Sequence, residues 1–303
     1  MIVKKLNYLF LFWQNFILSK IKRIIRQKLY YNLDNRKTCI LKAAEEQGLI
    51  DLMKKIETIV DDNDIVKQYT NISAENFSHP YWKTKLRAQH SFQISLVLKA
   101  IEFLNRHNEI ITIVDIGDSA GTHILYLKNL LKNIRSLSVN LDANAVEKIK
   151  NRGLEAICCR AEELDKYNIK PDIFMTFQTL EHILSPIHFL KLMSDKTECR
   201  YFIITVPYQL MSRMGLHYIR TNNLKKIHAE NLHIFELSPE DWKLIFKFCG
   251  WQIVFEKIYY QYPKKGLYKY TSAAWRANDF EGFYGVILEK NETYKKLYLD
   301  WGH

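Results

Sequence analysis

Glycine and proline are scarce in this chain of 303 residues, with 10 and 6 copies respectively. This composition excludes a collagen-like protein, a linker protein and a low-complexity chain. The sequence has no stretch of roughly 18 uninterrupted apolar residues, as a membrane-spanning helix needs, and no repeat at solenoid periods. Because 48% of the residues are apolar, the chain can close a hydrophobic core, which excludes wholesale disorder.

Cysteine is also sparse, and its spacing fits no zinc site. The five cysteines form an odd set without a Cys-x-x-Cys pair, namely Cys39, Cys158, Cys159, Cys199 and Cys249. We therefore expect reduced, mostly buried thiols in a cytoplasmic protein. A catalytic cysteine is disfavoured, because no neighbouring group would obviously lower a thiol pKa.

Positive charge is concentrated at the N-terminus. Residues 1–40 contain nine Lys and Arg against Asp34 alone, so they carry +8 of the total net charge of +11. A nucleic-acid-binding fold would spread or stripe its basic residues over the body. A nucleic-acid partner is therefore disfavoured.

The same N-terminal part combines this charge with apolar residues. We predict that residues 1–37 form a basic amphipathic helical segment, in which residues 1–30 bind an anionic membrane surface. This would place the protein on the inner face of a membrane. Alternatively, the apolar side of the segment packs on the body or in a homodimer.

Hydrophobic periodicity predicts helices before residue 110 and an alternation of strands and helices after it. Short β-branched runs such as residues 110–114 are typical of strands that are buried on both faces of a parallel sheet. The predicted strands are 110–114, 137–141, 156–159, 172–177, 201–206, 251–258 and 283–289. The predicted helices are 39–60, 83–105, 122–132, 143–151, 186–193 and 239–249.

This alternation predicts an α/β fold with a Rossmann-like, doubly wound, mostly parallel seven-stranded sheet that has helices on both faces. N-terminal helices precede it. After the basic segment, we predict a helical cap region at 38–109 and a core at 110–290 that contains a lid insertion at about 208–236. A C-terminal tail at 291–303 completes the chain.

The most informative segment is the turn after the first predicted strand, Val114-Asp115-Ile116-Gly117-Asp118-Ser119-Ala120-Gly121-Thr122. Glycine in such a turn permits positive φ and lets the backbone approach a ligand closely. In doubly wound sheets, ligands bind at the carboxyl ends of the strands. Asp142 follows the second predicted strand at this same edge, where a carboxylate can accept both hydroxyls of a ribose.

With these residues the chain resembles class I S-adenosylmethionine-dependent methyltransferases over about residues 85–290. The first motif of that family is an acidic residue followed by Gly-x-Gly-x-Gly. Asp115 matches the acid, Gly117 and Gly121 match the outer glycines, and Ser119 replaces the middle one. The resemblance implies S-adenosyl-L-methionine as the cofactor, bound by Asp115, Gly117, Ser119, Gly121, Asp142, Ala161, Glu162 and Gln178.

A nicotinamide-binding Rossmann domain would share the glycine turn and the ribose carboxylate. The segment Leu180-Glu181-His182 after the fourth strand favours the methyltransferase, and it is similar to ubiquinone-biosynthesis O-methyltransferases. In that group, a Glu three residues before the second Glu helps to hold a divalent cation. Gln178 stands at that position here, and because an amide is a poorer ligand for such a cation, we expect no required metal.

An acceptor hydroxyl needs its proton removed, most often by a His or a carboxylate. We predict His182, His233 and Glu181 as catalytic residues, with His228 as a further candidate. Each of these could instead be an ordinary hydrogen-bonded structural residue. The helix before the first strand often lies over the methionine end of the cofactor in this family, where Arg87 or His90 could meet its carboxylate, although a solvated helix face is the alternative.

The resemblance implies O-methylation of a small-molecule acceptor or of a surface-glycan or lipid-linked precursor. The overall basicity leaves an RNA-directed methyltransferase as an alternative. A third possibility is a non-catalytic scaffold that keeps the fold without the cofactor, for which Ser119, Gln178 and Arg160 depart from the family pattern.

Overall fold

The computed structural model describes residues 19–20, 24, 28–68, 74–106, 109–167, 169–214, 226 and 232–297. Most of the predicted membrane-binding segment lies outside the described residues, as do His228 and much of the predicted lid. Among the residues that are described, no helix combines the length and the apolar character needed to cross a bilayer.

A seven-stranded sheet forms the centre of the protein, as the sequence predicts, with the strand order β3-β2-β1-β4-β5-β9-β8. The strands are β1 (Ile111–Ile116), β2 (Ile134–Asn140), β3 (Ala156–Cys158), β4 (Ile173–Phe177), β5 (Tyr201–Tyr208), β8 (Trp251–Tyr260) and β9 (Gly282–Lys290). β1, β2, β3, β4 and β5 pair in parallel, whereas β9 pairs antiparallel with both β5 and β8. The carboxyl ends of the parallel strands therefore meet at one edge of the sheet.

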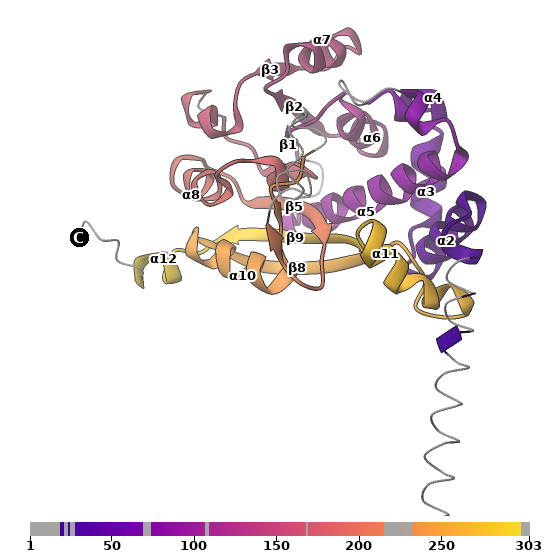
Figure 1. Ribbon diagram of the computed structural model, residues 1–303. Helices are drawn as coiled ribbons and strands as arrows, with labels where there is room; N and C mark the ends of the chain where they lie inside the picture. The colour runs from indigo at the N-terminus through magenta and orange to yellow at the C-terminus, as the bar shows by residue number, and fades with distance from the viewer. Residues whose placement is uncertain are drawn as a thin grey trace, which may run out of the picture.

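Helices cover both faces of this sheet, which confirms the doubly wound architecture (Figure 1). Successive residues of a strand point to opposite faces. Ile113 accordingly joins the buried cluster that includes α5, whereas Val114 joins the cluster on the other face. The helices after β1 are α6 (Thr122–Leu130), α7 (Ala143–Asn151), α8 (Pro186–Lys196), α10 (Pro239–Phe248), α11 (Ser272–Asn278) and α12 (Thr293–Leu297).

Helices α2 (Leu33–Glu46), α3 (Ile50–Glu57) and α4 (Asp62–Val66) lie beside α5 (Pro80–Leu104) at one end of the molecule (Figure 1). The prediction of one continuous helix over residues 39–60 is wrong, because the chain breaks between α2 and α3. Gly48 adopts a φ of +72° at this break, a left-handed conformation that ends a helix. Pro80 opens α5 at a first-turn position, where a missing N–H costs nothing.

A half-buried arginine connects α2 to the C-terminal part of the chain. The Arg36 guanidinium lies over the rings of Tyr30, Tyr81 and Trp275, at 4.4 to 4.7 Å from their centroids. It also pairs with Asp279 at 3.2 Å. These contacts hold α2 against α11, which lies next to it in Figure 1.

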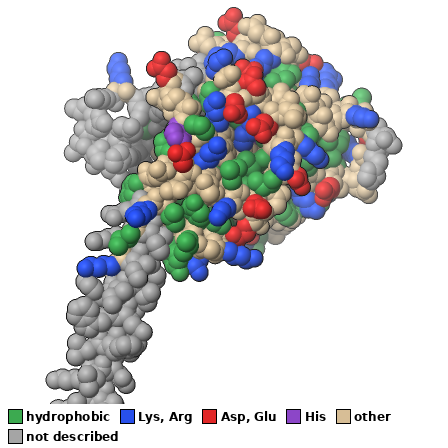
Figure 2. Space-filling view, turned by 90° about the vertical axis from the view of Figure 1, so that its right-hand side faces the viewer, with side chains coloured by type: hydrophobic (Ala, Val, Ile, Leu, Met, Phe, Trp, Pro, Cys, Tyr) green, Lys and Arg blue, Asp and Glu red, His purple; other side chains and the backbone are tan. Residues whose placement is uncertain are grey.

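Short elements complete the fold, namely η1 (Ala74–Phe77), η2 (Ala161–Tyr167), η3 (Leu180–His182), η5 (Leu267–Thr271), β6 (Arg213–Met214) and β7 (Phe235–Glu236). The described ends of the predicted lid form an antiparallel pair of β6 and β7. On the face shown in Figure 2, Lys and Arg side chains are interspersed with Asp and Glu, without a broad patch of one sign.

Candidate functional site

A cavity of about 430 Å³ opens at the carboxyl ends of β1, β2 and β4. Five of the eight predicted cofactor-binding residues line it, namely Gly117, Ser119, Asp142, Ala161 and Gln178. The other three are not among the lining residues. Asp115 is buried behind the turn, Gly121 starts α6, and the side chain of Glu162 lies outside the described part of the structure.

The two glycines of the turn are required by its packing. Gly117 has a φ of +92°, and a Cβ there would lie 2.3 Å from Thr179 Oγ1. Gly121 has a φ of +73°, and a Cβ there would lie 2.5 Å from Leu154 Cδ1. Side chains at either position would be strained and would collide with neighbours. The turn therefore lies directly against the segment after β4.

Asp118, which the sequence reasoning did not select, holds this turn in shape. Its Oδ1 accepts a hydrogen bond from Gly121 N at 2.8 Å, and its Oδ2 accepts one from Ser138 Oγ at 2.9 Å. Its carbonyl oxygen accepts a third from Asn140 Nδ2 at 3.0 Å. Burial, together with the nearby Asp115, raises the pKa of Asp118 to about 7. Asp118 thus joins β2 to the glycine turn.

Asp115 faces His123, a histidine that the sequence reasoning did not select. Asp115 Oδ2 lies 3.3 Å from Nδ1 of His123, and neither atom has a hydrogen-bond partner among the described residues. His123 Nε2 donates to Gln93 Oε1 at 3.0 Å, which leaves a lone pair on Nδ1 of the neutral ring. Burial raises the pKa of Asp115 and lowers that of His123 to about 4. Burial therefore disfavours the charged form of both side chains.

Helix α5 contributes His90 and Gln93 to the cavity wall, as the resemblance leads us to expect for His90. Arg87 is directed elsewhere, because its guanidinium donates to Ile56 O and to Asp62 Oδ1, each at 3.2 Å. Both Arg87 and His90 are buried, so the alternative of a solvated helix face is wrong.

Asp142 has a structural role in addition to its predicted one. It is the N-cap of α7, where its Oδ1 accepts from Asn144 N at 2.9 Å. Its Oδ2 makes no hydrogen bond within the described residues, and the residue lines the cavity.

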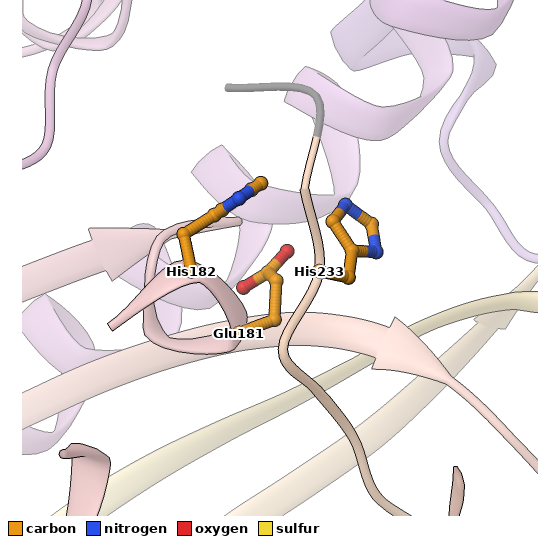
Figure 3. A group of neighbouring side chains, drawn as sticks. All are labelled: Glu181, His182 and His233. Carbon is orange, nitrogen blue, oxygen red and sulfur yellow. The ribbon is translucent and has the colours of Figure 1, made fainter. Parts of the chain in front are cut away.

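The three predicted catalytic residues meet at one end of this cavity, which His182 also lines. One ligand-type atom from each of Glu181, His182 and His233 lies within 4.8 Å of the others. Figure 3 shows the side chains of Glu181, His182 and His233 close together, and the two imidazole rings meet edge to face with their centroids 4.8 Å apart. His233 belongs to the segment before β7, which passes alongside η3.

Hydrogen bonds fix this arrangement. His182 Nδ1 donates to Leu232 O at 2.7 Å, and Ile234 N donates to Glu181 O at 2.8 Å. His233 Nδ1 donates to Glu236 Oε1 at 2.7 Å. The segment that carries His233 is therefore tied to η3 on both sides of the histidine.

Burial and neighbouring groups shift the pKa values of Glu181 and His233. Glu181 is fully buried, and neither of its carboxylate oxygens has a hydrogen-bond partner among the described residues. Burial raises its pKa to about 7. Burial alone would lower the pKa of His233, but its bond to Glu236 and the nearby Glu181 raise it above the ordinary value. The pKa values of both Glu181 and His233 are thus shifted upward.

Two chemistries fit this cluster. The carboxylate and imidazole groups can accept a proton from a hydroxyl at the end of the cavity. Two histidines and one carboxylate are also a ligand set that suits a divalent transition metal. Gln178, at the position of the subgroup's additional Glu, donates its amide Nε2 to Thr205 Oγ1 at 3.3 Å.

No protein-family model matches the chain, and no curated protein matches it by sequence. Among solved structures, it is similar to a putative sarcosine dimethylglycine methyltransferase from Galdieria sulphuraria, with a TM-score of 0.51 and 11% sequence identity. That match covers 82% of this chain and 99% of the other. At this identity the likeness concerns the fold alone, and the chain has the fold of S-adenosylmethionine-dependent methyltransferases.

Two further matches have lower TM-scores. Magnesium protoporphyrin IX methyltransferase from Synechocystis PCC 6803, solved with bound S-adenosylmethionine, has a TM-score of 0.48 at 11% identity, over 77% of this chain and 98% of that one. A S-adenosylmethionine-dependent methyltransferase from Archaeoglobus fulgidus has a TM-score of 0.43 at 15% identity, over 65% and 94%.

Proposed function

We propose that this protein transfers a methyl group from S-adenosyl-L-methionine to a hydroxyl of a small-molecule, glycan or lipid-linked acceptor. The observation that supports the proposal is the cavity, which the glycine turn, Asp142 and His182 all line. A volume of about 430 Å³ lies within the usual range of small-ligand pockets, about 300–1,000 Å³. The residues present therefore fit the proposed cofactor.

Each part of the cavity has a role in this proposal. The cofactor supplies a methyl group that is already activated by its sulfonium, so the protein mainly orients the reactants and excludes water. Asp142 would bind the ribose hydroxyls through the oxygen that is not used in the helix cap. His123 and Gln93 would lie near the amino-acid end. Neutral amide and imidazole groups there offer hydrogen bonds without a fixed charge.

The cluster of Glu181, His182 and His233 would take the proton of the acceptor hydroxyl. A group that accepts protons near neutral pH is best suited to this step, and the raised pKa of Glu181, about 7, meets that requirement. We retain the expectation that no metal is required. Dialysis against a chelator separates the two chemistries, because proton transfer by these side chains survives it and metal-dependent transfer does not.

Calorimetry with S-adenosylmethionine and S-adenosylhomocysteine tests the proposed cofactor, and a search for methylated products in extracts then identifies the acceptor. We expect both compounds to bind. A folded protein that binds neither would contradict the proposal and support a non-catalytic scaffold. A salt-dependent shift of RNA in a gel would instead support the RNA-directed alternative.

The remaining proposals concern location. The basic segment of residues 1–30 would bring the site to the inner face of a membrane, where a lipid-linked acceptor is available. A homodimer through the same segment is the competing proposal.

A further inference from the structure

Glu236 accepts three hydrogen bonds at the edge of the cluster formed by Glu181, His182 and His233. Its Oε1 accepts from His233 Nδ1 at 2.7 Å. Its Oε2 accepts from Gln209 Nε2 at 3.2 Å and from Arg213 Nε. Arg213 belongs to β6, Gln209 to the segment after β5 and His233 to the segment before β7. The carboxylate of Glu236 therefore links three parts of the chain.

The position of Glu236 is itself fixed by the backbone. β7 pairs antiparallel with β6, in a register that places Glu236 opposite Arg213. The side chain of Glu236 is 13% exposed, whereas that of Arg213 is 47% exposed, so the arginine closes the outer side of the carboxylate. His233 is packed on its other sides by the ring of His182 at 4.8 Å and that of Phe280 at 5.9 Å.

We propose that Glu236 is the positioning residue of this site: it fixes the His233 ring with Nδ1 protonated, so that Nε2 is the nitrogen available to the reaction. A carboxylate can only accept a hydrogen bond, so Nδ1 must carry the hydrogen. The neutral ring then has its lone pair on Nε2. Without Glu236, either nitrogen could carry the hydrogen and the ring could turn.

The use of Nε2 in the reaction rests on the proposed function. The orientation of the His233 ring does not, because it is a property of the folded protein. Glu236 is not among the residues that line the cofactor cavity. Its removal should therefore leave cofactor affinity unchanged. A merely structural role would instead lower stability without a specific effect on one imidazole.

The test is nitrogen-15 NMR of the His233 side chain in the full-length protein, at a pH raised until the ring is neutral. Because the pKa of His233 is raised, this pH is higher than for an ordinary histidine, whose pKa is about 6.5. We expect Nδ1–H as the dominant tautomer in the native protein. In Glu236→Ala, the tautomer ratio should shift by roughly tenfold to a hundredfold toward Nε2–H, which matches about 1.5–3 kcal/mol for a hydrogen bond to a charged group. Glu240→Ala is the matched control, because Glu240 is an exposed acid in α10.

A second variant keeps the test decisive if Glu236→Ala folds poorly. Glu236→Gln is nearly isosteric, and its amide can accept from or donate to Nδ1, so we expect a mixture of tautomers. Glu236→Asp should restore part of the native ratio. If the His233 signals of folded Glu236→Gln or Glu236→Ala match those of the native protein, the inference is wrong.

Kinetics separates this inference from the proposed function. If methyl transfer is measured, kcat should fall in Glu236→Ala while the KM for the cofactor stays unchanged. If the protein binds no cofactor, the proposed function fails, but the NMR result still decides the role of Glu236.

Discussion

Asp142 offers a test in which binding and stability can be separated. The structure gives it two roles, the predicted ribose contact and the observed N-cap of α7, and the two predict different responses to substitution. Asp142→Ala removes both roles. Asp142→Asn removes the negative charge but keeps a side chain that is an equally good cap.

The expected magnitudes follow from these contacts. Loss of the charged hydrogen bonding to the ribose should cost about 2 kcal/mol, or roughly a 30-fold rise in Kd. Loss of the cap should cost about 1 kcal/mol of folding stability. We therefore expect weakened cofactor binding in both variants and lowered stability only in Asp142→Ala.

Calorimetry with S-adenosylhomocysteine and urea denaturation measure the two effects on the same samples. Asp61 supplies a matched control, because it caps α4 by accepting from Asn63 N and Asp64 N and does not line the cavity. Asp61→Ala should lower stability without any change in affinity. If Asp142→Asn binds the cofactor as tightly as the native protein does, the ribose assignment is refuted.

Three further predictions concern other parts of the chain. Gly117→Val should abolish cofactor binding, because its side chain would collide with Thr179 and displace the turn that lines the cavity. Calorimetry checks this, with Gly153→Ala as a control at another glycine of positive φ, +73°, which has open space around it. Burial raises the pKa of Glu181 from its ordinary 4.5 to about 7, so the folded state binds a proton that the unfolded state has lost, and stability should fall as the pH rises through this window. Denaturation at several pH values should show a smaller fall in Glu181→Gln, and an equal fall would assign the effect to other groups. The full-length protein should co-sediment with anionic but not neutral vesicles, less so in salt, and not after deletion of residues 1–30; a protein that stays in the supernatant at low salt rules out the membrane proposal.

The central strands β1, β4 and β5 could be predicted from the sequence because they are buried on both faces. Such strands read as short apolar runs, and the predicted positions of β1, β4 and β5 differ from the observed ones by at most two residues at either end. The helix predicted over residues 39–60 was wrong for a local reason. Apolar periodicity continues across Gly48, and only the backbone conformation there separates α2 from α3.

The residues of the site that could be predicted are those that belong to a recognisable motif or have a reactive type of side chain. Gly117 and Asp142 follow strands in a recognisable pattern, and both line the cavity. His123 and Gln93 carry no such signal, because they meet through the packing of α5 on α6. Glu236 was missed for the same reason, because its contacts with His233, Gln209 and Arg213 depend on how the chain folds around β6 and β7.

Gln178 departs from the subgroup's pattern, and the structure supplies a reason for the amide. Gln178 has a φ of +52°, and its Nε2 donates to Thr205 Oγ1, which also accepts from Gln93 Nε2 at 3.2 Å. His123 in turn donates to Gln93 Oε1, so a chain of hydrogen bonds runs from α6 through α5 to β5. A carboxylate at position 178 has no N–H, so it would have to accept a hydrogen bond from this hydroxyl instead of donating one. The amide of Gln178 is therefore part of a connected hydrogen-bond network that joins α6, α5, β5 and the segment after β4.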